Sequence, residues 1–253
     1  MTPETAEDKC NNVTKSDLLF STPRQTEAFK FDHKVAEVFP DMISRSVPGY
    51  NEIIQGIGLL ANQFVQENSI VYDLGCSLGA ATLSIREQVE TEKYEIIGID
   101  NSQAMVERCQ QHLCAFRSPV KTTICQADIL DFDYQKASLI VINFTLQFLD
   151  KPSRSTLLKR LYEALQPGGA LILSEKLAFN DKEINQLFTQ QHHLFKKKNG
   201  YSDLEISQKR AALENVLIPE TLEQHHSRLK EAGFSHMHSW FQQLNFISLI
   251  TIK

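Results

Sequence analysis

The sequence lacks the features that mark membrane-spanning, secreted and metal-binding proteins. No apolar run is long enough to cross a bilayer, and the acidic, polar N-terminus does not resemble a signal peptide. The five cysteines are odd in number and include no C-x-x-C pair, which indicates reduced thiols in a cytosolic protein. They stand at positions 10, 76, 109, 114 and 125. The histidines show no i, i+4 metal spacing, so we expect no metal.

An excess of basic residues is also missing. The chain has 26 Lys and Arg against 31 Asp and Glu, a net charge of −5, which argues against an independent nucleic-acid binder. No Ser/His/Asp or Cys/His arrangement points to nucleophilic catalysis. What is present is an ordinary globular composition, 42% hydrophobic and 23% charged over 253 residues, which suits one α/β domain with a large core.

A loop of small residues stands between an apolar run and a helix start. Asp73, Gly75, Ser77 and Gly79 follow the pattern acid-x-Gly-x-small-x-Gly. A dinucleotide fingerprint would instead need glycine at Ser77 and Ala80, so an oxidoreductase is disfavoured. The pattern favours S-adenosyl-L-methionine (AdoMet), bound by loop backbone and helix N–H groups. Within this loop we attribute Cys76 to its small size rather than to reactivity.

The next two apolar runs also end in acids. Asp100 and Asn101 follow the run 95–99, and an acid there can accept hydrogen bonds from both ribose hydroxyls. Asp100, Asn101 or Ser102 could also cap the helix 103–113, and the spacing favours both roles together. Asp128 and Ile129 follow the run 121–126, where the acid can hold an adenine amino group and the apolar residue can cover the ring. The alternative for Asp128 is an ordinary turn acid.

Strands alternate with helices along most of the chain. This order predicts an α/β fold with a doubly wound, mostly parallel Rossmann-like sheet and helices on both faces. We expect residues 1–28 to form a mobile tail and residues 29–253 a single domain. The predicted strands are 69–74, 95–99, 121–126, 137–143, 170–175, 235–242 and 246–252, and the predicted helices include 29–40, 50–66, 103–113 and 152–165.

A helical insertion is expected over about residues 176–233, and it is the natural lid of the site. Ser202 and Glu205 form a capping box that starts a helix. In that helix the spacing of Ile206, Leu213 and Leu217 puts Arg210 on the apolar face, with Lys209 at its edge. An inward arginine requires an anion. The anion is either a ligand or a structural partner such as Glu175 or Asp41. Lys196 to Lys198 and Lys209 either steer a dianion or form a solvated face.

Four segments carry a resemblance to a known family. Residues 35–50, 72–84, 143–148 and 205–210, the last reading EISQKR, closely resemble the carboxy-S-adenosyl-L-methionine synthases of the class I AdoMet-dependent methyltransferase-like superfamily. The likeness covers about residues 30 to 253. It implies conversion of AdoMet and prephenate to carboxy-AdoMet and phenylpyruvate. It further implies a cytoplasmic homodimer with no direct nucleic-acid or membrane contact, whose product serves a separate tRNA wobble-uridine carboxymethyltransferase.

The resemblance also implies a set of binding residues. They are Tyr50, Gly75, Cys76, Ser77, Asp100, Asn101, Asp128, Ile129, Asn143 and Arg210. In the implied mechanism prephenate loses carbon dioxide and hydroxide, a sulfonium ylide captures the carbon dioxide, and Arg210 pairs with the new carboxylate. Whether Arg210 acts in its own or a neighbouring subunit stays open. Two alternatives also stay open, an ordinary AdoMet-dependent methyltransferase and a non-catalytic AdoMet carrier.

Overall fold

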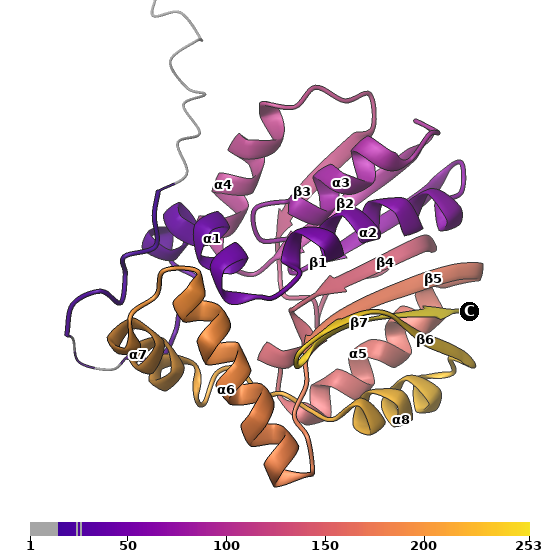
Figure 1. Cartoon of the computed structure of the whole chain (residues 1–253). Coiled ribbons are helices and arrows are strands. Elements are labelled where there is room, and N and C mark those ends of the chain that lie inside the picture. The colour runs from indigo at the N-terminus through magenta and orange to yellow at the C-terminus, as the bar shows by residue number, and fades with distance from the viewer. Residues whose placement is uncertain (1–14, 24, 26) are drawn as a thin grey trace, which may run out of the picture.

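A seven-stranded sheet in the order β3-β2-β1-β4-β5-β7-β6 forms the centre of the molecule (Figure 1). The computed structural model describes residues 15–23, 25 and 27–253. The strands are β1 Ser69–Leu74, β2 Tyr94–Asp100, β3 Lys121–Gln126, β4 Ala137–Asn143, β5 Leu165–Lys176, β6 His236–Gln243 and β7 Phe246–Ile252. Only β7 runs antiparallel to its neighbours, which confirms the predicted doubly wound, mostly parallel sheet.

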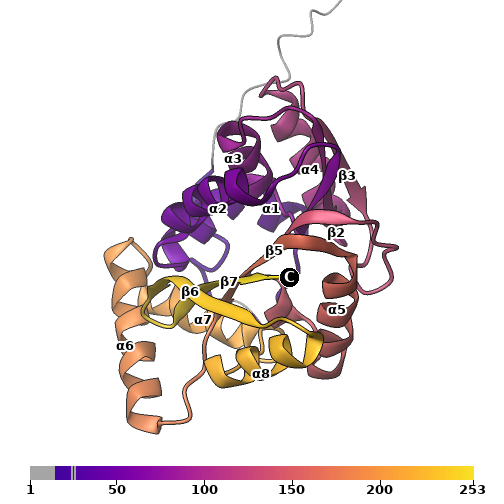
Figure 2. The same ribbon diagram turned by 90° about the vertical axis from the view of Figure 1, so that its right-hand side faces the viewer.

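Helices cover both faces of this sheet. On one face lie α2 and α3, with α4 beside β2 and β3, and on the other lie α5 and α8 (Figures 1 and 2). The helices are α1 His33–Ser46, α2 Tyr50–Phe64, α3 Ala80–Gln88, α4 Gln103–Cys114, α5 Lys151–Ala164, α6 Lys182–Lys198, α7 Asp203–Leu213 and α8 Leu222–Ala232, with a short 3-10 turn, η2, at Leu146–Phe148. No helix within the described ranges has the length and apolarity to span a membrane.

The strand β4 shows why the sheet is buried on both sides. Its side chains alternate between the two faces, Leu139 and Val141 toward α2 and Ile140 and Ile142 toward α5, and all four are fully buried. Burying one such aliphatic side chain contributes about 1.5–3 kcal/mol. The carboxyl ends of β1, β2, β3 and β4 therefore meet at one edge of a rigid sheet.

The first helix begins and ends later than expected. Asp32 accepts a hydrogen bond from the N–H of Val35 at 3.0 Å and caps α1, so the helix starts at His33 rather than Phe29. We expected an end at Pro40, but the helix continues to Ser46. Met42, in its second half, is buried in an apolar cluster with Met105 of α4, and this packing offsets the cost of an internal proline.

Part of the expected tail is packed against the domain. Residues 1–14, 24 and 26 lie outside the described residues, but Asp17 and Phe20 are buried at 1% and 3% exposure. The Asp17 carboxylate accepts a hydrogen bond from the hydroxyl of Tyr201 at 2.5 Å, and its backbone N–H donates to Asp41 at 2.6 Å. The expectation of a mobile tail through residue 28 is therefore wrong for Asp17 and Phe20. The polar composition of this segment predicted a mobile tail, but Asp17 connects α1 to the insertion through its bonds to Asp41 and Tyr201.

The segment between β5 and β6 divides into two parts. Helix α8 packs against α5 as part of the sheet's cover, whereas α6 and α7 stand beside α1 at the carboxyl edge (Figure 1). Only α6 and α7 thus have the position expected of a lid. At the base of this pair, Leu177 forms a parallel bridge with Glu220.

One fully buried arginine joins the insertion to the rest of the fold. Arg154 of α5 donates to the Glu220 carboxylate at 2.5 Å and to the carbonyl of Ile218 at 2.9 Å. The same guanidinium donates to the carbonyls of Gln147 and Leu149, at 3.2 and 2.8 Å. A buried charge with this many partners is compensated, and removing it would leave Glu220 short of a counter-ion.

Candidate active site at the carboxyl edge of the sheet

The loop after β1 has the backbone shape that its small residues predicted. Gly75, Ser77 and Gly79 have φ of 73°, 49° and 79°, all in the left-handed region. A Cβ at Gly75 would lie 2.1 Å from Oγ1 of Thr145, so the loop and the residues after β4 approach too closely for any side chain. The loop is therefore a tight turn, and the N–H groups of Gly75 and Cys76 both donate to the carbonyl of Ile99, at 2.7 and 3.1 Å.

Asp73, the first residue of this motif, stabilises the loop by binding the start of α3. Asp73 is buried, and its Oδ2 accepts hydrogen bonds from the N–H and the hydroxyl of Thr82, at 3.2 and 2.7 Å. Burial raises the pKa of Asp73 to about 6, with a further contribution from the charge of Asp100. Asp73 thus fixes the start of α3 against the end of β1.

Asp100 lies at the corresponding position of β2 and is positioned by the loop. Its Oδ2 accepts the N–H of Ser77 and its Oδ1 the N–H of Ser102, each at 2.9 Å. Burial raises the pKa of Asp100. Ser102, not Asp100, caps α4, since its hydroxyl accepts the N–H of Met105 at 3.2 Å. Of the three caps that the sequence allowed, Ser102 is the one used, and the Asp100 oxygens keep lone pairs for a ligand. Asn101 beside it is exposed.

Asp128 and Ile129 follow β3 along the same edge. The Asp128 side chain is exposed, and its Oδ1 accepts the N–H of Leu130 at 2.9 Å, as a turn acid does. That bond uses one of several acceptor positions on the carboxylate. Ile129 is 6% exposed and packs into the main apolar core. The geometry is compatible with both roles that the sequence left open for Asp128.

Asn143 ends β4 with a buried oxygen that has no partner. Among the described residues, no group hydrogen-bonds to its Oδ1. An unsatisfied buried acceptor costs about 1–3 kcal/mol, so this atom marks a place for an outside donor. Phe144, the next residue, has φ of 58°, and its ring lies 6.5 Å from that of Tyr50. Burial raises the pKa of Tyr50, with a smaller effect from Asp73, which places Tyr50 at the same edge.

The thiol of Cys76 is packed inside the fold, and its backbone N–H donates to the carbonyl of Ile99 at 3.1 Å. The thiol is buried against Cys109, and this contact together with burial raises the pKa of Cys76 well above its ordinary value. The Sγ of Cys76 would lie 3.1 Å from a Cβ added at Gly98 of β2. This agrees with a residue kept for its small size.

Arg210 is not on the buried face of its helix. Glu205, Ile206, Lys209 and Ala212 form that face, and Arg210 is exposed. The prediction of an inward arginine is therefore wrong. Neither suggested structural partner binds it. Asp41 pairs with Arg45 at 2.9 Å, and Glu175 lies fully buried near Arg154, where burial raises its pKa to about 8. Arg210 instead lies close enough to Lys176 and His193 for its charge to lower the pKa of both.

Two of the lysines that the sequence could not assign to a ligand site or to a solvated face, Lys196 and Lys209, lie on the inner side of the insertion. Lys196 of α6 and Lys209 of α7 are 8% and 5% exposed, whereas Lys197 and Lys198 are exposed. The Nζ of Lys209 donates to the hydroxyl of Ser46 at 3.0 Å and lies 3.7 Å from Asp17. Burial, together with the charges of Lys209 and Lys176, lowers the pKa of Lys196 to about 7. No spacing in the sequence distinguished Lys196 from its neighbours.

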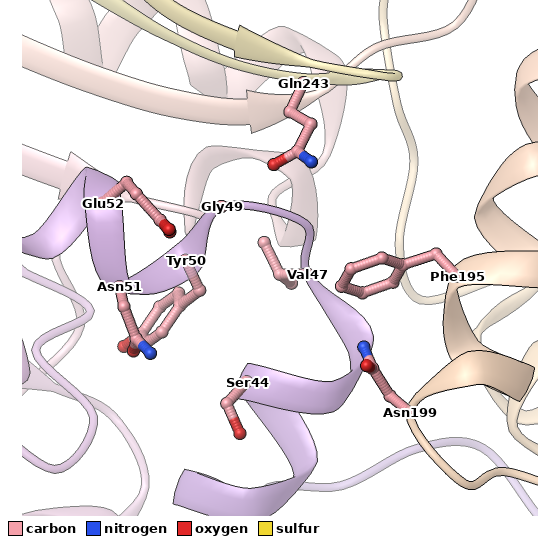
Figure 3. A pocket seen from close by; sticks show the side chains of 9 residues that line it. All are labelled: Ser44, Val47, Gly49, Tyr50, Asn51, Glu52, Phe195, Asn199 and Gln243. Atoms are coloured by element: carbon pink, nitrogen blue, oxygen red, sulfur yellow. The ribbon is translucent and has the colours of Figure 1, made fainter.

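A cavity of about 260 Å³ opens beside Tyr50. Figure 3 shows it between the α1–α2 turn, the end of α6 and the β6–β7 hairpin, with Phe195 and Asn199 on one side and Gln243 above. Tyr50 is the only predicted site residue in its lining. This polar, open cavity adjoins the loop edge but does not include the loop itself. No group of three or more potential metal ligands occurs among the described residues.

Comparison with known proteins decides between the possible families. Residues 71–169 match a methyltransferase domain. The carboxy-S-adenosyl-L-methionine synthase of Photorhabdus laumondii is 54% identical over 238 residues, covering 94% of each chain. The synthase of the same name from Yersinia enterocolitica is 55% identical over 94% of this chain and 90% of its own.

The chain belongs to the carboxy-S-adenosyl-L-methionine synthase family.

Solved structures place this synthase fold among the methyltransferases. An O-methyltransferase family protein from Burkholderia thailandensis has a TM-score of 0.67 at 14% identity, covering 88% of this chain and 60% of its own. Human N-acetylserotonin methyltransferase, solved in complex with SAM, has a TM-score of 0.58 at 16% identity, covering 87% and 55%. At these identities the likeness shows the shared fold alone. Within the synthase chain, Tyr50, Lys196 and Arg210 lie outside the segment that matches the general methyltransferase domain.

Proposed function

We propose that this chain converts AdoMet and prephenate to carboxy-AdoMet and phenylpyruvate. The observation that carries the proposal is the 54% identity over 94% of both chains with a carboxy-S-adenosyl-L-methionine synthase. The fold also brings three kinds of group together at one edge of the sheet. They are the loop 75–79, the carboxylates of Asp100 and Asp128, and the buried Oδ1 of Asn143, which has no hydrogen-bond partner among the described residues. Oxidoreductase chemistry with a dinucleotide is not supported, because Ser77 and Ala80 take the places of two required glycines.

The residues at the sheet edge fit AdoMet as a substrate. The backbone of Gly75, Cys76 and Ser77 would face its methionine part, and the unpaired Oδ1 of Asn143 would accept from its ammonium group. The Asp100 carboxylate, already oriented by two backbone N–H groups, would accept the ribose hydroxyls. Asn101, Asp128 and Ile129 would contact the adenosine, and Tyr50 would close the site from α2. Along the edge, Tyr50 and Asn143 lie beside the loop, Asp100 follows at the end of β2, and Asp128 comes last, after β3.

The proposed reaction balances without a protein nucleophile. The prephenate dianion loses its ring carboxylate as carbon dioxide and its ring hydroxyl as hydroxide, and becomes aromatic phenylpyruvate. A proton leaves the sulfonium methyl and forms water with that hydroxide. The resulting ylide carbon attacks carbon dioxide, giving a carboxymethyl group on the sulfonium. The protein's contribution is to hold the reactants together and to exclude water, a role suited to α6 and α7.

We assign to Arg210 the binding of the new carboxylate. Its planar guanidinium matches a carboxylate, and no hydrogen bond or ion pair to another described residue occupies it. An exposed arginine can reach the site by closure of α7 or from a second subunit. A homodimer is part of this proposal, supported by three exposed apolar residues on α6, Ile184, Leu187 and Leu194. In the cytosol the product would serve a separate enzyme that carboxymethylates the wobble uridine of tRNA.

One experiment tests the proposed reaction. The purified protein is incubated with AdoMet, with and without prephenate, and the nucleoside products are weighed by mass spectrometry. We expect a product heavier than AdoMet by one carboxyl group only when prephenate is present, together with phenylpyruvate. Absence of that product would refute the synthase assignment. Prephenate-independent methyl transfer to an acceptor would support the ordinary methyltransferase, whose fold this chain shares.

A further inference from the structure

The inner face of the insertion gathers positive charge that the fold does not neutralise. Lys196 of α6 is 8% exposed, and no acceptor among the described residues hydrogen-bonds its ammonium. Lys176, at the end of β5, and Lys209 of α7 are the charges that act on it. Lys209 is matched by Asp17 at 3.7 Å, which leaves the buried Lys196 and the partly buried Lys176 without a counter-ion among the described residues.

A layer of aromatic rings lies between this pair and the proposed AdoMet site. The Nζ of Lys176 is 5.9 Å from the ring centroid of Phe246, and the ring of His192, one turn before Lys196 on α6, is 4.9 Å from the same ring. The ring of Phe246 in turn lies 6.0 Å from that of Phe144, the residue after Asn143. One layer of aromatic side chains thus lies between the two lysines and Asn143, whose Oδ1 has no donor among the described residues.

An uncompensated buried ammonium is costly in a protein that has no use for it. Burying a charge without a partner costs several kcal/mol, and native proteins keep such groups mainly where a ligand supplies the missing charge. Exposed lysines on the same helix show the contrast, since Lys197 pairs with Asp203 at 2.6 Å in open solvent. The arrangement of Lys176 and Lys196 therefore points to an anion.

We propose that Lys176 and Lys196 form a carboxylate subsite that holds the carboxylate retained by the product of the dianionic second substrate. This inference rests on the proposed function, since that function supplies a dicarboxylate. A carboxylate that must leave as carbon dioxide is not held by buried cations, because ground-state stabilisation of the anion would raise the barrier to its loss. The lysines consequently bind the keto-acid end, and the departing carboxylate lies away from them.

The subsite also predicts proton uptake on binding. The groups that face Lys196 are His192 and His193 on its own helix, Lys176 of β5 and Lys209 of α7. Burial lowers the pKa of His192 to about 2, so this histidine stays neutral. The pKa of Lys196, about 7, would rise toward its ordinary value when a carboxylate arrives. Binding above neutral pH would therefore take up a proton, and the affinity would fall as pH rises through 7 and beyond.

Steady-state kinetics of Lys196→Met and Lys176→Met test the subsite. We expect KM for prephenate to rise by about tenfold or more in each, with a smaller change in kcat and an unchanged Kd for AdoMet. Lys196→Arg should recover part of the affinity. Lys198→Met is the matched control, because it makes the same change on the same helix at an exposed position, and its KM should equal that of the wild type.

Phenylpyruvate identifies which carboxylate is held. It carries only the retained group, so it should inhibit the wild type competitively and lose about tenfold in affinity in Lys196→Met. Calorimetry of phenylpyruvate binding, in buffers of different ionisation enthalpy, should show proton uptake by the wild type and none by Lys196→Met. Unchanged KM and inhibition in both lysine variants, with the wild type active, would overturn the subsite alone. An inactive wild type would instead refute the proposed function on which it rests.

Discussion

The carboxylate of Asp100 and the backbone N–H of Ser77 are joined by a hydrogen bond of 2.9 Å that crosses 23 positions of the chain. The acid proposed to bind ribose and the loop proposed to bind methionine therefore hold one another in place. Ser77 adopts φ of 49°, a conformation that costs a non-glycine residue about 1–2 kcal/mol. The hydrogen bond to Asp100 helps to fix that conformation.

Replacing Asp100 by Asn should weaken AdoMet binding strongly. An amide keeps the shape of the carboxylate but loses one acceptor oxygen and the charge, so we expect Kd to rise by about tenfold to a hundredfold. Isothermal titration calorimetry measures the change. Asp133→Asn, at an exposed position between β3 and β4, serves as the control and should leave Kd unaltered. Equal Kd for Asp100→Asn and wild type would exclude Asp100 from the site.

Gly75→Ala should destabilise the fold more than Gly168→Ala. Both glycines have positive φ, 73° and 77°, so the backbone strain is matched. A Cβ at Gly75 meets Thr145 at 2.1 Å, whereas a Cβ at Gly168 meets nothing within 4 Å. We expect the urea-unfolding free energy to fall by at least about 1 kcal/mol more for Gly75. Similar losses in the two variants would mean that Thr145 moves aside freely.

Asn143→Ala should separate binding from stability. Removing an acceptor that has no partner leaves the free protein as stable as before, or more stable by up to about 1 kcal/mol. The Kd for AdoMet should nevertheless rise by about tenfold, because the ligand's ammonium loses its acceptor. Thermal unfolding with and without AdoMet reports both quantities. A destabilised variant with normal affinity would show that Asn143 is structural.

Arg210→Leu should lose the product and keep the substrate. Because Arg210 is exposed and not bonded to other described residues, the change in stability should stay within about 0.5 kcal/mol. Retention of carboxy-AdoMet, measured by equilibrium dialysis, should be lost while AdoMet binding persists. Arg210→Lys keeps the charge but loses the planar guanidinium, so its retention of carboxy-AdoMet should lie between those of the wild type and Arg210→Leu. Equal loss of both ligands would contradict a role limited to the new carboxylate.

The stability gained in Lys196→Met should depend on pH. The pKa of Lys196 falls from 10.5 to about 7 on folding, so between these values the unfolded chain binds more protons and unfolding free energy rises with pH. Below pH 7 the full penalty of the buried charge remains. The methionine variant should therefore exceed the wild type in Tm most clearly at about pH 6, by a few degrees, and the gap should shrink toward pH 10. A difference independent of pH would show that Lys196 stays charged.

Much of the fold followed from local patterns. The strands 69–74, 121–126, 137–143 and 246–252 have the predicted bounds, because apolar runs bounded by turn residues have few other buried solutions. The loop was predictable for a similar reason, since few residues besides glycine accept its backbone angles. Such features depend on neighbours in sequence and need no knowledge of distant contacts.

The insertion was harder to predict because its buried face is partly charged. Apolar residues alone placed Arg210 inward, but Glu205 and Lys209 take inward positions in the structure. Leu217 also misled the assignment, since α7 ends at Leu213 and a residue beyond the helix shares no face with it. Glu205 is bonded to Ser202 in the predicted capping box, but the partners of Lys209, Asp17 and Ser46, lie more than 150 residues away. No spacing within the helix records such partners.

The guanidinium of Arg154 connects the two segments that border the proposed site. Its bonds to Ile218 and Glu220 hold the return of the insertion, and its bonds to Gln147 and Leu149 hold the turn just after Asn143. A tilt of α6 and α7 that moves residues 218–220 would therefore also move the end of β4, beside the proposed AdoMet site. Binding of one substrate would in this way shift the residues that bind the other.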